Sequence, residues 1–116
     1  MQLKKHKTKK AQIDWEIIVN KRIVGTLSFL NIDNFYEILY IEVENPFRKK
    51  GYGQILIKEL IISAKEKNKK EIFLEVSSNN IPAINLYKKY NFKEYSTRKK
   101  YYKDGSDAIM MKLEFQ

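Results

Sequence analysis

The sequence predicts an α/β (α+β) domain built on a mixed, mostly antiparallel sheet, with a central pair of parallel strands and flanking helices. Runs of β-branched and aromatic residues dominate residues 13–43. Beyond residue 51, segments with apolar residues at helical spacing alternate with short strand-like runs. Such alternation brings strands together in parallel, whereas strands joined by tight turns pair antiparallel. The expected order of elements is therefore β-β-β-α-β-α-β-β.

Three strands are expected first. Residues 13–19 and 22–32 are β-branched and aromatic runs, and the break at residues 20–21 (Asn-Lys) is typical of a hairpin turn. A second turn at residues 33–34 (Asp-Asn) leads into a third strand at residues 35–43.

Helices and strands then alternate. Residues 52–67 place apolar side chains at four-residue steps, which indicates a helix with a broad apolar face. Residues 71–76 form a short strand. A second helix over residues 83–90 follows, and either Asn79 or Asn80 can cap its amino end.

The last two strands form a hairpin. Asn91 is expected to end the second helix in the left-handed conformation that Asn tolerates. Residues 92–102 then alternate as a strand, residues 103–106 turn the chain, and residues 107–115 return antiparallel.

Composition narrows the chemistry. The chain has no cysteine and one histidine, His6, so disulfides, thiolate metal sites and thiol catalysis are excluded, and no metal site is expected. No apolar run approaches the ~20 residues that a membrane helix needs. The basic start lacks an apolar h-region, so a cytoplasmic location is expected.

The net charge of +9 lies at the two ends of the chain. Residues 1–12 carry +5 and residues 88–116 carry +4, while residues 13–87 are neutral. Lysines outnumber arginines twenty to three, whereas nucleic-acid readers rely on arginine. Nucleic acid is therefore not expected as the main ligand. Residues 1–12 are expected to form a basic, flexible tail before a single domain at residues 13–116.

A basic, glycine-containing loop precedes the first helix. Residues 48–53 read Arg-Lys-Lys-Gly-Tyr-Gly. Gly51 and Gly53 allow a tight turn, so that successive backbone N–H groups can point at one anion where the helix begins. Ligands of such sheets bind at the carboxyl ends of parallel strands, which is where this loop lies. The loop is therefore a candidate phosphate-binding site.

Two motifs resemble those of the GNAT acetyltransferase superfamily. Residues 48–53 resemble its R/Q-x-x-G-x-G/A signature. Residues 80–92 resemble its N-x-x-A-I-x-L-Y-x-x-x-G-F pattern, with Asn91 in place of the glycine. The resemblance covers residues 13–115. Residues 101–111 and the Leu-Glu-Val run at 74–76 are similar to RimI-type enzymes, which acetylate the N-terminal amine of a ribosomal protein, although serines follow that run where those enzymes commonly have arginine.

The resemblance implies an acetyl-coenzyme A (acetyl-CoA)-dependent N-acetyltransferase that acts by direct transfer in a ternary complex. It implies Tyr87 as the general acid, Glu75 as the base with Glu42 as its rival, and the Val43 N–H as the oxyanion donor. One of Tyr101 and Tyr102 is expected to contact the acceptor. The implied cofactor contacts are Ile41, Val43, Arg48, Lys49, Lys50, Gly51, Tyr52, Gly53, Asn80, Ala83 and Tyr87.

The sequence does not decide which amine accepts the acetyl group. A protein N-terminal amine is the leading candidate. The alternatives are a small amine, such as a polyamine or antibiotic-like molecule, and a non-catalytic basic RNA- or ribosome-binding module on the same fold. The family usually places a strand and two helices before the strand at residues 13–19, but only twelve residues precede it here. We therefore expect residues 13–43 to expose an apolar strip that either a second copy of the chain or the substrate protein covers, and a homodimer is favoured.

Overall fold

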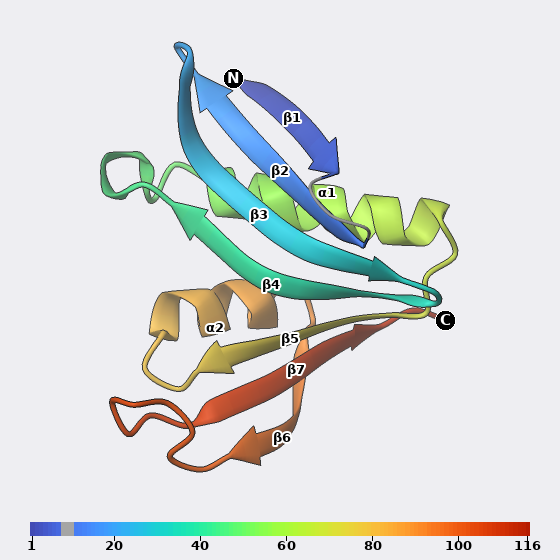
Figure 1. Cartoon of the computed structure of the whole chain (residues 1–116), viewed down its shortest axis with the longest axis vertical. Coiled ribbons are helices and arrows are strands. Elements are labelled where there is room, and N and C mark those ends of the chain that lie inside the picture. Colours follow the sequence, from blue (N-terminus) through green and yellow to red (C-terminus); the bar gives the residue numbers. More distant parts are fainter. Residues whose placement is uncertain (8–10) are drawn as a thin grey trace.

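A computed structural model describes residues 1–7 and 11–116 of the chain (Figure 1). Seven strands form one sheet in the order β1-β2-β3-β4-β5-β7-β6, and only the β4–β5 pair is parallel. The predicted fold class is confirmed. The elements are β1 (Gln2–Lys7), β2 (Gln12–Val19), β3 (Arg22–Ile32), β4 (Phe35–Val43), the 3-10 helix η1 (Asn45–Phe47), α1 (Tyr52–Glu66), β5 (Glu71–Ser77), α2 (Ile81–Lys89), β6 (Lys93–Arg98) and β7 (Ala108–Glu114).

The expectation of a flexible basic tail is wrong for residues 2–7, which form the edge strand β1 and pair antiparallel with β2. The many lysines of this segment predicted a solvated tail, but the aliphatic stems of lysines can cover apolar surface in a strand. Lys5 Nζ lies 4.4 Å from the centroid of the Trp15 ring and 3.6 Å from a Glu59 carboxylate oxygen. Residues 8–10 of the expected tail lie outside the described residues. Only residues 8–11 separate β1 from β2, which is too few for two helices.

Turn conformations agree with the residues that the sequence offers. Asn20 and Lys21 have φ values of 50° and 65°, as a type I′ hairpin turn requires at both central positions. Asn91 has a φ of 71° and ends the α2 segment in the left-handed conformation, as expected. The sequence therefore specifies these reversals through side chains that tolerate positive φ.

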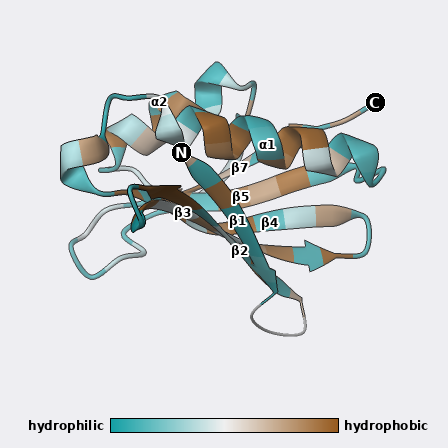
Figure 2. Cartoon of the chain, turned by 90° about the horizontal axis from the view of Figure 1, so that it is seen from above, coloured by the Kyte–Doolittle hydropathy of each residue, from teal (hydrophilic) through white to brown (hydrophobic). Residues whose placement is uncertain are grey.

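Both helices cover the same face of the sheet, which we call the helix face (Figure 2). The core lies between this face and α1, where Leu56, Ile57, Leu60 and Ala64 are fully buried. Among the described residues, no helix covers the opposite side, which we call the open face. None of the described helices combines the length and apolarity needed to cross a membrane.

The open face of β2, β3 and β4 differs from the apolar strip that the sequence led us to expect. Residues paired directly across neighbouring strands share a face, so the register assigns the rows. Three of these rows, read from β2 through β3 to β4, are Asp14–Ser28–Tyr40, Glu16–Thr26–Glu42 and Gln12–Leu30–Glu37. The expectation of a continuous apolar strip is therefore wrong for the middle of this face, where polar and acidic residues predominate. Apolar side chains gather toward both ends of this face, where Ile32 pairs with Phe35 and Ile18 pairs with the exposed Ile23.

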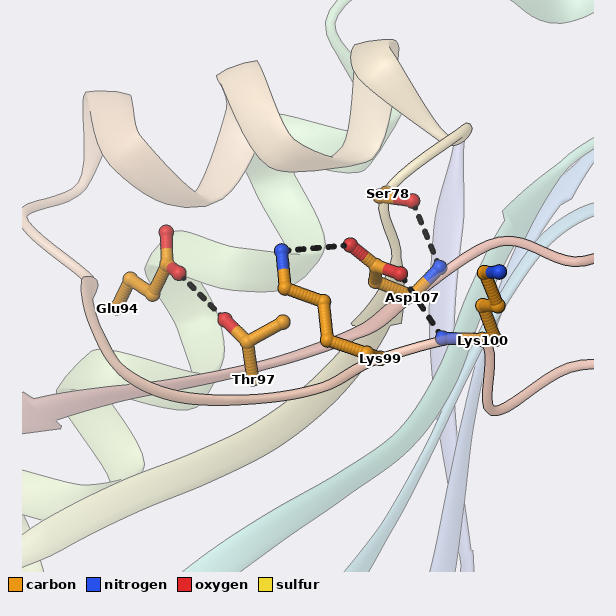
Figure 3. Close-up of polar contacts among 6 residues, drawn as sticks. All are labelled: Ser78, Glu94, Thr97, Lys99, Lys100 and Asp107. Atoms are coloured by element: carbon orange, nitrogen blue, oxygen red, sulfur yellow. Dashed lines mark hydrogen bonds and ion pairs between the residues drawn. The ribbon is translucent and has the colours of Figure 1, made fainter.

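Asp107 ties the β6–β7 connection to the end of β5 (Figure 3). Its carboxylate accepts a 3.0 Å hydrogen bond from the Lys100 backbone N–H and lies 3.4 Å from Lys99 Nζ. Its own backbone N–H donates to Ser78 Oγ at 2.9 Å. The Lys100 N–H is the main reason that the pKa of Asp107 lies below its ordinary value. The connection that carries Tyr102 is thereby held beside β5.

Candidate active site

A cleft opens where β4 leaves β5. The two strands pair only from Phe35 opposite Glu71 to Ile38 opposite Leu74. Immediately afterwards the β3–β4 register shifts, so that Leu39 is an extra residue on β4. Bulges of this kind bend a strand and end its pairing, and they are over-represented near active sites. The second half of β4 therefore has one edge without a neighbouring strand.

Backbone N–H groups of β4 point into this gap. The N–H of Glu44 donates to the carbonyl of Val24 on β3, at 2.9 Å. Because successive N–H groups of a strand alternate between its two edges, those of Val43 and Ile41 face away from β3. The Val43 carbonyl faces the same way and accepts a 2.8 Å hydrogen bond from Arg48 Nε. Two expected cofactor contacts, Ile41 and Val43, thus offer backbone donors at the gap.

The cleft has a volume of about 850 Å³, within the usual range for small-molecule sites. It is lined by Tyr40, Ile41, Glu42, Val43, Asn45, Phe47, Arg48, Lys49, Gly51, Tyr52, Gly53, Gln54, Asn80, Pro82, Ala83 and Leu86. Ile41 and Val43 point to the helix face, whereas Tyr40 and Glu42 point to the open face. The cleft therefore reaches both faces of the sheet.

The amino end of α1 forms one wall of the cleft. Gly51 precedes the helix with φ 85° and ψ 6°, a left-handed conformation that favours glycine. The first turn of α1 contains no acidic residue and its first N–H groups have no side-chain cap. Those groups and the positive end of the helix dipole favour an anion, and phosphate binding at this loop stays a prediction. The basic side chains of Arg48 and Lys49 also line this wall.

The two glycines of the loop have different roles. We expected both to allow the tight turn, and this is right for Gly51 only. Gly53 lies inside α1 without a positive φ. A Cβ atom at Gly53 would approach Leu86 Cδ2 of α2 to 3.4 Å. Gly53 therefore allows close approach of the two helices.

Asn80 is the residue that caps α2, which resolves the choice left open by the sequence. Its Oδ1 accepts a 3.3 Å hydrogen bond from the Ala83 N–H. Asn79 instead directs its side-chain amide toward Asp104, at 3.4 Å. Asn80 and Ala83 both line the cleft, and their contact with a cofactor stays a prediction.

Tyr87 lies on α2, packed against Phe92, and only 4% of its surface is exposed. Burial raises its pKa to about 12, so the phenol stays protonated at neutral pH. Among the described residues, none forms a hydrogen bond with its hydroxyl, and no fully buried side-chain polar atom lacks a partner. A fully buried hydroxyl without a partner would break that rule, so the Tyr87 hydroxyl oxygen keeps some solvent-accessible surface. Tyr87 is absent from the lining residues given above, so its role as an acid stays a prediction.

The two carboxylates occupy different surroundings. Glu42 lines the cleft and is exposed. Glu75 is not among the lining residues, and it accepts a 2.9 Å hydrogen bond from the Tyr102 hydroxyl. Burial, followed by this hydrogen bond and the charge of Glu75, raises the pKa of Tyr102 to about 12. The structure thus brings Glu42 to the cleft and pairs Glu75 with Tyr102.

Sequence reasoning missed Gln54, which joins the two helices beside the cleft. Its Oε1 accepts hydrogen bonds from Lys89 Nζ and from the Tyr90 hydroxyl, both at 3.0 Å. The signal available in the sequence was the position of Gln54 directly after the basic loop at residues 48–53. The bond from Tyr102, and not Tyr101, to Glu75 had no such signal, because both residues lie in an irregular connection. Which of the two tyrosines contacts the acceptor stays a prediction.

Comparisons with known proteins agree with this arrangement. Residues 4–92 match the family described as the acetyltransferase (GNAT) family. Over 75 residues, the chain is 47% identical to an N-alpha-acetyltransferase of Sulfolobus acidocaldarius, a match that covers 64% of this chain and 45% of that protein. Over 76 residues, it is 36% identical to a putative ribosomal protein bS18-alanine N-acetyltransferase of Bacillus subtilis, covering 65% and 50%. The chain therefore spans about half the length of these relatives.

Solved structures share the fold. The ribosomal-protein-S18-alanine N-acetyltransferase of Escherichia coli superimposes with a TM-score of 0.86 at 25% identity, covering 92% of this chain and 71% of that one. A GNAT family acetyltransferase of Elizabethkingia anophelis, solved with acetyl-CoA bound, gives a TM-score of 0.80 at 25% identity, covering 90% and 77%. Sequence motifs, fold and family match agree, and the chain belongs to the GNAT acetyltransferase family.

Proposed function

We propose that this protein is a cytoplasmic N-acetyltransferase that transfers the acetyl group of acetyl-CoA directly to the N-terminal amine of a protein. The observation that carries the proposal is the cleft at the β4–β5 divergence, where backbone donors of β4 meet the amino end of α1. The names of the bacterial and archaeal relatives support a protein acceptor.

The residues present fit acetyl-CoA. Its pyrophosphate is an anion, and residues 48–53 offer backbone N–H groups, a left-handed glycine and three basic side chains. Its amide-containing arm needs hydrogen-bond partners, which the free edge of β4 and the Asn80 cap supply. When bound, acetyl-CoA supplies an activated acetyl thioester.

Three groups of the chain perform the proton and charge chemistry. A carboxylate, Glu42 or Glu75, accepts the proton that the acceptor ammonium must lose before its nitrogen attacks. The Val43 N–H donates to the carbonyl oxygen as negative charge develops there. The C–N bond forms, the C–S bond breaks, and the protonated Tyr87 gives its proton to the sulfur. The nitrogen loses its second proton as it becomes an amide, and that proton restores the Tyr87 phenol. Direct transfer suits a chain without cysteine.

Cofactor binding is tested first, on the full chain. Acetyl-CoA should bind in calorimetry, and Gly51→Val should abolish binding because a branched side chain is strained at φ 85° and obstructs approach to the loop. Undiminished affinity in Gly51→Val would contradict the proposed site. Peptides with free and blocked N-termini then identify the acceptor by mass spectrometry. Acetylation of polyamines but not of peptides would favour the small-amine alternative, and cofactor binding without any transfer would favour the non-catalytic module.

The acid is tested separately. Tyr87→Phe should lower kcat by ~10²–10⁴-fold at nearly unchanged acetyl-CoA affinity, because it removes a proton donor and not a binding surface. Turnover within twofold of the unmodified protein would refute the role. Comparing Glu42→Gln with Glu75→Gln identifies the base, since only loss of the base should abolish the acid limb of the pH–rate profile.

A further inference from the structure

Charge is unevenly distributed between the two faces of the sheet. Directly paired residues share a face, so the register places seven of the fourteen acidic residues on the open face. They are Asp14, Glu16, Glu37, Glu42, Glu71, Glu75 and Glu114. The same strands place four lysines and arginines there, Lys4, Lys93, Arg98 and Lys112. Four positive and seven negative charges leave this face at −3 in a chain of +9.

Carboxylates in the middle of the open face lack cationic partners within the described residues. The ion pairs of this face flank β3 and β4: His6 of β1 meets Glu16 of β2 at 2.7 Å, and Lys112 of β7 meets Glu71 of β5 at 3.8 Å. Glu37 and Glu42 of β4, by contrast, form no ion pair with any described residue. The centre of the open face is therefore available to positive charge from outside.

Aromatic rings lie beside these carboxylates. Phe35 and Phe73 pack edge to face with centroids 5.3 Å apart, and Tyr95 lies 6.1 Å beyond Phe73. In the register, Glu37 is paired with Phe73, and Glu71 with Phe35. Carboxylates beside half-exposed rings suit lysine and arginine, whose stems pack on rings while their charges pair with carboxylates. Nucleic acid, an anion, is disfavoured on the same surface.

The surface is continuous with the cleft. Tyr40 and Glu42 line the cleft from the open face, and Glu37 follows on the same face of the same strand. Four strand steps of about 3.3 Å place Glu37 roughly 13 Å from Glu42. An extended peptide spans this distance with about four residues.

We propose that the open face docks a lysine- and arginine-rich segment of the acceptor polypeptide, beginning about four residues after the amine that is acetylated. This inference rests on the proposed function and adds a substrate class to it. A second copy of the chain is a poorer occupant, because symmetric face-to-face pairing would oppose the unpaired carboxylates of Glu37 and Glu42 to acidic faces like their own. The homodimer expected from the sequence is therefore kept as an outcome of the test.

The test compares three acceptors on the full chain. Two octapeptides share their first four residues and carry either lysine and arginine or serine and glutamine at the last four positions, and the third acceptor is the tetrapeptide alone. At low salt, kcat/KM for the basic octapeptide should exceed that for the neutral one about tenfold. The preference should shrink as salt rises, because the Debye length falls from ~30 Å at 0.01 M to ~10 Å at 0.1 M.

Variants then locate the surface. Glu37→Lys should abolish the preference without changing turnover of the tetrapeptide, and the milder Glu37→Gln should reduce it. Glu66→Lys makes the same charge change at the end of α1, over the helix face, and should retain the preference. Equal rates for both octapeptides in the unmodified protein would overturn the inference, as would equal losses in Glu37→Lys and Glu66→Lys.

Two further readouts separate this inference from the proposed function. If no peptide is acetylated, the proposed function fails, and fluorescence anisotropy of the labelled basic octapeptide still tests docking through the same variants. Light scattering detects self-association. A dimer that Glu37→Lys dissociates, together with absence of a basic preference, would assign the open face to a second copy and overturn the inference.

Discussion

The two glycines of the cofactor loop should respond to alanine in opposite directions. Gly51 has a φ of 85°, and no atom lies within 4 Å of a Cβ built there. Alanine at Gly51 therefore meets backbone strain without a clash. Gly53 sits in the first turn of α1 with ordinary helical φ, and its added Cβ would meet only the terminal methyl of Leu86 at 3.4 Å. Alanine at Gly53 therefore meets a movable neighbour and no strain.

The magnitudes follow from these geometries. A left-handed conformation costs an alanine roughly 1–2 kcal/mol, of which a stiffer unfolded chain returns about 0.4–1 kcal/mol. Gly51→Ala should therefore lower the free energy of unfolding by about 1 kcal/mol. Within a helix, alanine is favoured over glycine by roughly 0.5–1 kcal/mol, so Gly53→Ala should raise it by about 0.5 kcal/mol. At about 4 °C per kcal/mol for a chain of this size, the two Tm values should differ by roughly 6 °C.

The assay is denaturant unfolding of both variants beside a matched control, Gly105→Ala. Gly105 also has a φ of 85° with nothing within 4 Å, but it lies in the β6–β7 connection. This control should lose the same stability as Gly51→Ala while acetyl-CoA affinity stays unchanged. If Gly51→Ala and Gly53→Ala shift stability in the same direction, the reasoning that only Gly51 is required by its backbone conformation is refuted.

Two further predictions concern pH. Burial raises the pKa of Tyr87 to about 12, so the unfolded chain releases this proton first as pH rises. Stability should fall by about 2–3 kcal/mol between pH 10 and 12 through this group, and Tyr87→Phe should flatten that part of the urea-unfolding profile; an unchanged slope would contradict it. Hydrogen bonds lower the pKa of Asp107, so its contribution is present above the ordinary carboxyl value and is lost as pH falls below it. Asp107→Asn should flatten the acid side of the same profile. A profile that keeps its full acid slope would refute the role of Asp107 in holding the β6–β7 connection beside β5.

Most of the fold could be predicted because periodicity reports which face of an element is buried. The α1 pattern of apolar residues at four-residue steps became a stripe of fully buried side chains. The edge strand β1 could not be predicted, because Leu3 is the only strongly apolar residue in its span. Lys5 takes an inward position that pattern analysis assigns to solvent, and its partners Trp15 and Glu59 are remote in sequence. The insertion of β7 between β5 and β6 is likewise set by tertiary packing.

The candidate site was predictable where backbone chemistry needs a particular residue. Gly51 and Asn80 were found because a left-handed turn and a helix cap restrict the residue type. The extra residue on β4 left no such trace, since Leu39 is an ordinary strand residue. The pairing of Tyr102 with Glu75 was also invisible, because it depends on how a remote loop folds back. The acidity of the open face needed the register between strands.

The short β4–β5 ladder has a mechanical consequence. Four residue pairs join β1–β4 to β5–β7, and α1 packs on the β3–β4 side of that seam. A molecule bound in the cleft would contact β4 and α1 on one side and the start of α2 on the other. It would therefore hold the two parts of the sheet together across the short β4–β5 ladder. When the ligand-free chain is pulled by its two ends, the pairing between β4 and β5 should break first. Slower hydrogen exchange of the backbone amides of residues 35–38 and 71–74 in heavy water would then show that the cleft is occupied, without any turnover.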